Sequence, residues 1–369
     1  MYQELNVSAD ELNSGLGLAM HAVTPKPVKP IYSGVLADAQ DGVVMLTATD
    51  GAMTVRTSID ADVKKPGKTV YPARLLYELM RRQQGRDISI SVDDRNVAKI
   101  SGLGSKTTMA CMAPEDFPSV PEIENGYTVT VPAGKLKNAI QRMMFAVSTD
   151  ESRKILTGIL MEFHADEVRM VGIDGFKLAV MTIPQVNTVP GKDRIVVPGV
   201  IMNELSKMLP DGDTPVTITY NDGHAVFGLD GVKLYATLLI GEFIDYEKLR
   251  TSQSSTAVTV DKGAVYEALE RCNLMAKEGK NNLIVMDISP QYGIHLSARA
   301  ERGDAHEEVT AQVDGQDVKI AFNSQYLMDA IRNAPHDTIV LHFNSGAAPC
   351  FIRPAEGNEF EYLVLPVRI

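Results

Sequence analysis

Residues 171–180 read VGIDGFKLAV and residues 47–55 read TATDGAMTV, and both place an Asp-Gly pair between apolar, β-branched runs. Aspartate accepts hydrogen bonds from the backbone of a turn, and glycine adopts positive φ at no steric cost. Each stretch therefore predicts two strands joined by a tight turn. Asp50 and Asp174 lie 124 residues apart, and a weaker third candidate is SARAERGD at residues 297–304.

Helical stretches recur at the same interval. One series is YPARLLYELMRR (71–82), VPGVIMNELSKML (197–209) and FNSQYLMDAIRNA (322–334). The second is SADELNSGLGLAMHAV (8–23), VPAGKLKNAIQRMMFAV (131–147) and VDKGAVYEALERCNLMA (260–276). Phe117 and Phe243 share the spacing, and Phe360 follows 117 residues later. The shared interval indicates three tandem copies of one unit.

Each copy reads as helix, strands, helix, strands. Runs such as GVVMLTATD (42–50) and TIVLHF (338–343) are short, β-branched and bounded by Asp, Asn or Gly, as strands are. We therefore expect an α+β fold in which two helices cover one face of an antiparallel sheet in each copy. The polar stretches EIENGY (122–127) and RTSQSSTA (250–257) place the boundaries, giving domains 1–125, 126–251 and 252–369.

Composition restricts the possible partners. The chain has 47 acidic and 36 basic residues and a formal net charge of −11, so its average surface repels DNA, RNA and anionic lipid. No segment has the pattern of a signal peptide or a membrane span, so we expect a cytoplasmic protein. Cys111, Cys272 and Cys350 lack the spacing of a zinc site or disulfide framework and are expected to be buried, reduced thiols.

The last residues, EYLVLPVRI (361–369), alternate in a way that predicts a half-buried strand. Pro366 has no backbone donor, which would confine the strand to a sheet edge. Such a strand either closes a core or also lines a surface pocket, and its own sequence leaves both alternatives open.

Positive charge is concentrated on the six expected helices, which carry eleven basic and eight acidic residues. Ordinary solvated helix faces account for this as well as a phosphate-facing surface does. Basic residues in the loops after the first helices favour the phosphate-facing alternative. The candidate DNA-facing residues are Lys26, Lys29, Arg74, Arg81, Arg82, Lys135, Lys137, Arg142, Arg153, Lys154 and Lys207.

No motif predicts catalysis. GLGSKTTMA (102–110) has the wrong glycine spacing for a phosphate loop, and the seven histidines lack metal-ligand spacing. We therefore expect no catalytic residue, no metal and no cofactor. Two alternatives to a DNA-binding protein remain open. One is an enzyme that uses the Asp-Gly turns in an interdomain cleft. The other is a protein-interaction scaffold that does not encircle DNA.

Taken together with AVSTDESRKILTGILMEF (146–163), FPSVPEIE (117–124) and YLVLPVRI (362–369), these landmarks resemble the bacterial DNA polymerase III β-subunit, or sliding-clamp, family. The resemblance implies three similar domains per chain and two chains joined head to tail in a ring around duplex DNA. Twelve helices packed at ordinary distances enclose about 25 Å, which clears a duplex of about 20 Å, whereas six leave roughly 7 Å. The resemblance to this family further implies a non-enzymatic processivity factor of DNA replication. Its partners would be the replicative polymerase, the clamp loader and other clamp-motif proteins.

The resemblance also implies a pocket for a short partner peptide between the second and third domains. Its lining would be Leu156, Ile173, Gly175, Phe176, Lys177, Leu178, Ile244, Lys248, Leu249, Asn323, Tyr326, Leu363, Val364, Leu365, Pro366, Val367 and Arg368. Phe176 and Lys177 stand where the family often has His and Arg, and Ile244 where proline is usual. Acidic ends of partner peptides would meet Lys177, Lys248 or Arg368. The implied dimer interface includes Thr107, Met109, Leu274 and Met275.

Overall fold

The computed structural model describes residues 3–83, 85–102, 104–124, 126–185, 194–250 and 254–368. Its α-helices are α1 (Ala9–Ala19), α2 (Ala73–Arg81), α3 (Ala133–Met143), α4 (Gly199–Met208), α5 (Lys262–Glu278) and α6 (Ser324–Asn333). Its 3-10 helices are η1 (Met20–Ala22), η2 (Pro30–Ser33), η3 (Pro114–Asp116), η4 (Met144–Ala146), η5 (Glu151–Thr157), η6 (Tyr246–Leu249) and η7 (Lys280–Asn282). The α-helices begin at the positions that the repeated stretches predict.

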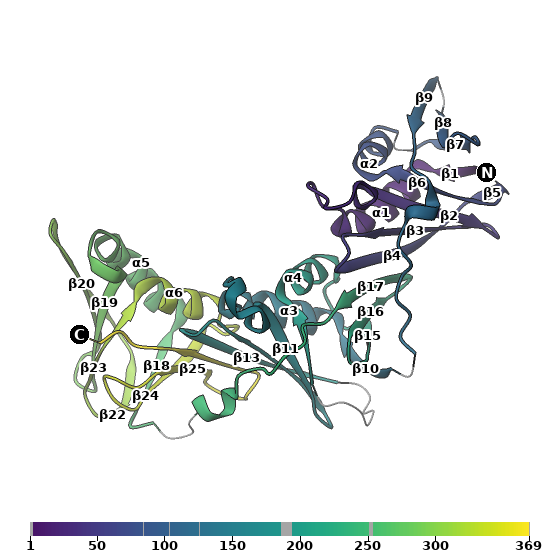
Figure 1. Ribbon diagram of the computed structural model, residues 1–369. Helices are drawn as coiled ribbons and strands as arrows, with labels where there is room; N and C mark the ends of the chain where they lie inside the picture. Colours follow the sequence, from purple (N-terminus) through teal and green to yellow (C-terminus); the bar gives the residue numbers. More distant parts are fainter. Residues whose placement is uncertain are drawn as a thin grey trace. The chain divides into compact units, whose positions relative to one another are not determined.

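The chain forms two compact units (Figure 1). Unit 1 comprises Met1–Ala133 and Lys207–Leu238, and unit 2 comprises Gly134–Ser206 and Leu239–Ile369. Every strand pair in both units is antiparallel, which confirms the α+β arrangement with antiparallel sheets.

Unit 1 contains two sheets. The first has the order β5 (Asp62–Lys65), β1 (Gln3–Ser8), β7 (Asp87–Val92), β8 (Val97–Gly102) and β9 (Ser105–Ala110). The second has the order β10 (Tyr127–Pro132), β15 (Pro215–Tyr220), β16 (His224–Leu229), β17 (Val232–Thr237), β4 (Met53–Asp60), β3 (Val43–Thr49), β2 (Gly34–Gln40) and β6 (Gly67–Pro72). Gly102 ends β8 and Ser105–Ala110 form β9, and these two strands pair, so the GLGSKTTMA stretch joins two strands and does not open a helix.

Unit 2 also contains two sheets. The nine-stranded sheet, called sheet C, has the order β14 (Arg194–Pro198), β11 (Gly158–Phe163), β12 (Glu167–Ile173), β13 (Lys177–Pro184), β26 (Phe360–Val364), β25 (Cys350–Pro354), β24 (Thr338–Phe343), β18 (Thr256–Asp261) and β22 (Gln312–Gly315). The smaller sheet has the order β21 (Gly303–Val309), β20 (Gly293–Ala300), β19 (Leu283–Ser289) and β23 (Val318–Asn323).

The large sheets are shared between sequence repeats, which differs from the expectation that each copy has a sheet of its own. β4 pairs with β17, and β13 pairs with β26, so in each case a strand of one repeat continues the sheet of the next. Pairing satisfies the backbone groups that an edge strand would leave exposed. The repeats are therefore visible in the sequence, but the middle one contributes strands to both units.

The prediction of a C-terminal edge strand is wrong. β26 ends at Val364 and lies inside sheet C, between β13 and β25. Pro366 follows the strand and so needs no ladder donor. Two hydrogen bonds hold the backbone that follows β26. Leu365 N donates to Phe176 O at 3.0 Å, and Val367 N donates to Ala321 O at 2.8 Å.

The two faces of sheet C are covered differently. Leu178 and Leu363 point into a buried cluster with Phe243 and Tyr246 of the segment that follows β17. Neighbouring strand residues point to the opposite face, where the Tyr362 hydroxyl donates to the Arg142 and Asn333 carbonyls at the ends of α3 and α6. These helices lie along that side of the sheet (Figure 1). Strand alternation thus decides which side chains face the helices.

Helix α1 approaches its sheet closely at one glycine. A Cβ built on Gly15 would lie 2.7 Å from Ile59 Cγ2 and 2.9 Å from Leu46 Cδ1, whereas one on Gly17 would meet only the Tyr77 ring at 3.8 Å. Residues 14–20 (SGLGLAM) belong to the stretch 8–23 that the sequence predicts to be helical, and Gly15 allows the helix to pack closely against the sheet.

This difference gives a matched pair of stability predictions. Gly17→Ala should raise the free energy of unfolding by about 0.5–1 kcal/mol because alanine favours a helix interior. Gly15→Ala should lower it by about 1–3 kcal/mol because the new methyl overpacks the α1–sheet contact. Denaturant titration followed by circular dichroism measures both; equal shifts of the same sign would contradict the close approach.

Candidate functional site

The Asp-Gly turn of unit 2 lies at the centre of the predicted pocket residues. Asp174 Oδ1 accepts from Phe176 N and Lys177 N, both at 2.8 Å, and Gly175 has φ of 97°. Asp50 makes the same contacts to Ala52 N and Met53 N, and Gly51 has φ of 96°. Both aspartates are used in shaping turns, which confirms the structural interpretation of the repeated pair.

Lys177 does not lie at a cationic rim as predicted. It begins β13 on the face toward α6, and only 9% of its side chain is exposed. Its Nζ lies 3.3 Å from Asp174 Oδ2, 3.6 Å from Asp329 Oδ2 and 4.9 Å from the centre of the Tyr326 ring. Because residue parity in the strand sends this side chain under the helix, its charge is already matched by two carboxylates.

Phe176 remains at the surface, with 53% of its area exposed. Its ring stacks on Tyr326, with centroids 5.3 Å apart. Asn323 begins the helix that carries Tyr326: its Oδ1 accepts from Gln325 N at 3.0 Å and from Tyr326 N at 3.4 Å. The cap thus fixes the first turn of α6, and with it the ring against which Phe176 rests.

A segment from Leu239 to Leu249, called the wall, covers the pocket face of sheet C. Phe243 and Tyr246 are buried in the cluster beneath it, whereas Ile244 and Leu249 are 40% and 42% exposed. The cluster also includes four of the predicted lining residues, which are Leu156, Ile173, Leu178 and Leu363. These four therefore support the surface from below.

Four exposed side chains form the surface above this core, and we call them the apolar patch: Phe176, Ile244, Leu249 and Leu365. Val364 is fully buried, while Pro366 and Val367 are half-buried. The exposed members come from a turn, the wall and the chain end. A surface that leaves large apolar side chains in water next to a well-packed core is typical of a binding site.

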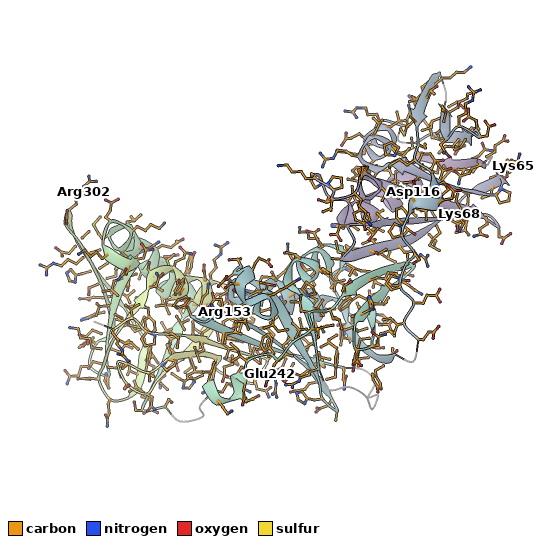
Figure 2. The ribbon with its side chains drawn as sticks, viewed as in Figure 1. Lys65, Lys68, Asp116, Arg153, Glu242 and Arg302 are labelled. Atoms are coloured by element: carbon orange, nitrogen blue, oxygen red, sulfur yellow. The ribbon has the colours of Figure 1, made fainter. Side chains whose placement is uncertain are left out.

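Cationic groups border the patch. Arg153, which is labelled in Figure 2, lies on η5. Its Nη2 donates to the Asp174 carbonyl at 3.3 Å, whereas the sequence predicts that Arg153 faces DNA. Lys248 is 82% exposed and pairs with Asp245 at 2.8 Å, and Arg368 is exposed. The contact with Asp174 brings Arg153 to the Asp-Gly turn, while its assignment as a DNA-facing residue stays a prediction. The contact with the turn could not be seen in the sequence.

Comparison with known proteins identifies the family. The models of the N-terminal, central and C-terminal domains of the DNA polymerase III β-subunit match residues 3–121, 130–245 and 251–368. The chain belongs to the DNA polymerase III β-subunit family. It is 30% identical to the β sliding clamp of Synechocystis sp. over 97% of both chains. This confirms the resemblance stated from the sequence.

Solved structures agree with this assignment of the DNA-clamp fold. The sliding clamp of Bacillus subtilis superposes over 100% of both chains with a TM-score of 0.96 and 26% identity. A clamp from Bartonella birtlesii, bound to griselimycin, also covers both chains fully, with a TM-score of 0.93 and 27% identity.

Most of the predicted DNA-facing residues of this β-subunit family member are exposed: Lys26, Lys29, Arg74, Arg81, Arg82, Lys135, Arg153, Lys154 and Lys207. Some also have partners within the chain. Arg81 and Arg82 bind Glu78, and the half-buried Arg142 donates Nη1 to the Asn333 and Ala334 carbonyls at 3.3 Å.

Helix polarity explains much of the basic character. Arg81, Arg142 and Lys207 lie in the last turns of α2, α3 and α4, where cations stabilise the helix dipole. Arg142 also caps the carbonyls that end α6. Part of the charge that the sequence assigned to DNA therefore stabilises helices.

The predicted interface residues differ in exposure. Leu274 on α5 is 65% exposed, and Thr107 and Met275 are half-buried. Met109 is only 3% exposed and packs inside unit 1, because it points inward from edge strand β9. Of the four, Leu274 offers the most surface to a second chain.

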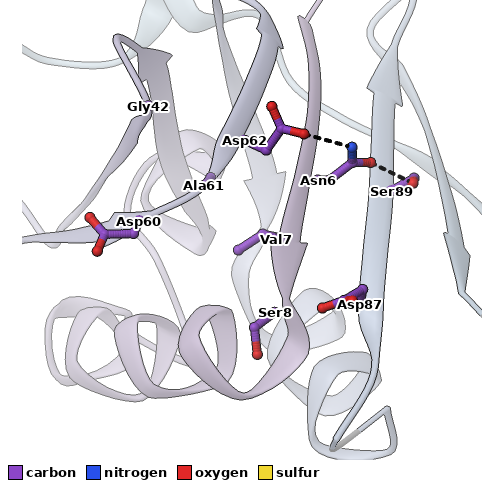
Figure 3. Close-up of a pocket in the computed structure, with 9 residues that line it drawn as sticks. All are labelled: Asn6, Val7, Ser8, Gly42, Asp60, Ala61, Asp62, Asp87 and Ser89. Carbon is purple, nitrogen blue, oxygen red and sulfur yellow. Dashed lines mark hydrogen bonds between the residues drawn. The ribbon is translucent and has the colours of Figure 1, made fainter.

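The cysteines and acidic surfaces show no sign of chemistry. Burial raises the pKa of the Cys111 and Cys272 thiols to about 11, and all three cysteines are free. A hollow of about 740 Å³ in unit 1 is lined by Asp60, Asp62 and Asp87 (Figure 3), where Asn6 donates to Asp62 and accepts from Ser89. Over the residues that the structure describes, no His, Cys, Asp or Glu cluster has metal-binding geometry, and no helix could cross a membrane.

The buried pairing of Lys177 gives a stability prediction. Lys177→Met should lower the free energy of unfolding by about 1–3 kcal/mol, because Asp174 and Asp329 would lose the buried cation that they share. Lys248→Met removes an exposed lysine that pairs with one aspartate, and it should change the free energy of unfolding by less than about 0.5 kcal/mol. Thermal unfolding of the two variants under identical conditions decides; a harmless Lys177→Met would refute the pairing.

Proposed function

We propose that this chain is a DNA sliding clamp: a processivity factor that encircles duplex DNA as a head-to-tail homodimeric ring and tethers the replicative polymerase and other partners. The family match along all three repeats carries the proposal. The exposed apolar patch supports the tethering role, since it offers a partner peptide apolar contacts bordered by Arg153, Lys248 and Arg368.

The mechanism depends on topology and weak attraction. A closed ring cannot leave the duplex sideways, so contacts with phosphate need only be weak and screened, and weak contacts permit sliding. A formal charge of −11 suits this task because the rest of the surface discourages nonspecific binding. The exposed lysines Lys26, Lys29, Lys135 and Lys154 are the best candidates for facing DNA, ahead of Arg142, whose guanidinium already caps α6.

Further parts of the proposal concern organisation. The domains are 1–125, 126–251 and 252–369, and the first domain of one chain meets the third of the other, with Leu274 at the junction. The protein performs no catalysis of its own and acts in the cytoplasm with the DNA polymerase III holoenzyme. The two alternatives from the sequence, an Asp-Gly enzyme and a non-encircling scaffold, have no comparable support, because both Asp-Gly turns use their carboxylates internally.

Ring closure is tested by retention on DNA. The protein, loaded by a clamp loader, should stay on a nicked circular plasmid and be lost once the plasmid is cut, because only a linear duplex has an end to slide from. Sedimentation should give twice the chain mass of 40.2 kDa, and Leu274→Arg should shift it toward one chain mass. Equal retention on circular and linear DNA would refute encirclement.

The peptide-binding role is tested at the chain end. Deleting residues 366–369 should weaken griselimycin binding about tenfold or more, because Leu365 would lose the anchor that Val367 makes to Ala321. Isothermal titration calorimetry measures the affinity, and sedimentation should still report the dimer. Unchanged affinity would remove the chain end from the binding surface.

A further inference from the structure

Six side chains of alternating charge form a continuous ionic chain beside the wall. In order they are Arg353, Glu361, Arg250, Glu247, Arg169 and Glu167. Arg353 lies on β25, Glu361 on β26, Glu247 on η6, and Arg169 and Glu167 on β12, and Arg250 directly follows the wall. The ionic chain therefore links the wall to strands of sheet C at two places. Its three cations and three anions leave it neutral.

Glu361 is the most buried member, with 10% of its side chain exposed. Each of its carboxylate oxygens accepts a hydrogen bond from one guanidinium. Arg250 Nε donates to Oε1 and Arg353 Nε donates to Oε2, both at 2.6 Å. Burial alone would lower the pKa of Arg250, but the hydrogen bonds and charges of Glu361 and Glu247 together outweigh it and hold that pKa above its ordinary value. Short, charge-assisted bonds of this kind are stronger than exposed surface pairs.

Arg250 connects the ionic chain to the wall through Glu247. Its Nη1 lies 3.0 Å from both oxygens of Glu247 on η6, and Glu247 in turn accepts from Arg169 Nη1 at 2.9 Å. Glu247 therefore connects the wall to β12 directly, and to β26 through Arg250 and Glu361. Of the exposed wall members of the apolar patch, Ile244 precedes Glu247, and Leu249 lies between Glu247 and Arg250.

The backbone does little to hold this segment. Leu239 N donates to Val196 O at 2.9 Å, but from Ile240 to Leu249 the described chain has no strand pairing with sheet C. Among the described residues, side chains also attach the wall: the buried rings of Phe243 and Tyr246, the bond of Tyr246 OH to Glu162 at 2.6 Å, and the ionic chain. The position of the wall thus depends on them.

We propose that Arg250 and Glu361 are positioning residues that hold the wall, and thereby set the affinity of the apolar patch for its partner peptide. Neither belongs to the predicted binding surface, so they act through Ile244 and Leu249. The inference rests on the proposed function of the patch. Arg353 binds the same carboxylate, but this ion pair joins β25 to β26, which are already paired as strands. We therefore expect the Arg353 ion pair not to position the wall.

Arg353 therefore supplies a matched control. In the full-length protein, Arg250→Met and Arg353→Met each remove one guanidinium at 2.6 Å from Glu361 and leave the other in place. Griselimycin affinity, measured by calorimetry at 25 °C, should fall at least fivefold for Arg250→Met and less than twofold for Arg353→Met, while their melting temperatures fall comparably. Arg250→Lys should recover part of the affinity. Equal losses of affinity, or no loss for Arg250→Met, would overturn the proposal.

Hydrogen exchange gives a readout that needs no ligand. Amides of residues 240–250 should exchange faster in Arg250→Met than in Arg353→Met, with exchange in α6 and β13 unchanged in both. If the unmodified protein fails to bind griselimycin, the assignment of the patch fails, and this comparison still decides whether Arg250 positions the wall. Identical exchange in the two variants would rule the positioning role out.

Discussion

The pairing of β13 with β26 is the constraint on which the candidate site depends. Lys177 lies opposite Val364 and Leu178 opposite Leu363, and the ladder ends in the bond from Leu365 N to Phe176 O. A slip of one residue would turn every side chain to the other face. In the observed register, Leu178 and Leu363 support the patch, Lys177 goes beneath α6, and Phe176 and Leu365 emerge side by side at the surface.

Charge in this chain serves internal contacts before it serves partners. Lys177 is matched by two aspartates, and Arg142 and Lys262 donate to the carbonyls that end α6. Arg250 and Arg353 bind one glutamate. A count of basic residues on helices therefore overstates the cationic surface. Most of the candidate DNA-facing residues nonetheless remain exposed, which suits a ring that holds DNA through weak contacts.

The sequence was sufficient for the repeats, the helices, the Asp-Gly turns and the family, because each depends on local pattern and spacing. It could not show that β26 joins β13, since strand partners distant in sequence leave no local signal, and the edge-strand interpretation of Pro366 failed for that reason. The contact of Arg153 with the Asp174 carbonyl was missed because a basic loop residue has no pattern that distinguishes phosphate from a carbonyl. The ionic chain was missed because its members lie on segments far apart in the sequence.

Over the residues that the structure describes, the repeat also explains why the Asp-Gly turn of unit 2 carries an apolar patch and that of unit 1 does not. In unit 1 the bond from Thr237 N to Ala52 O, at 2.9 Å, corresponds to that from Leu365 N to Phe176 O. Alanine and threonine thus occupy the places of phenylalanine and leucine. The cavity there, about 100 Å³, is lined by polar groups that include Thr49, Thr54 and His224, and the Tyr32 ring lies against Gly51. Two copies of one backbone arrangement therefore present different surfaces because of a few side chains at the turn and the strand end.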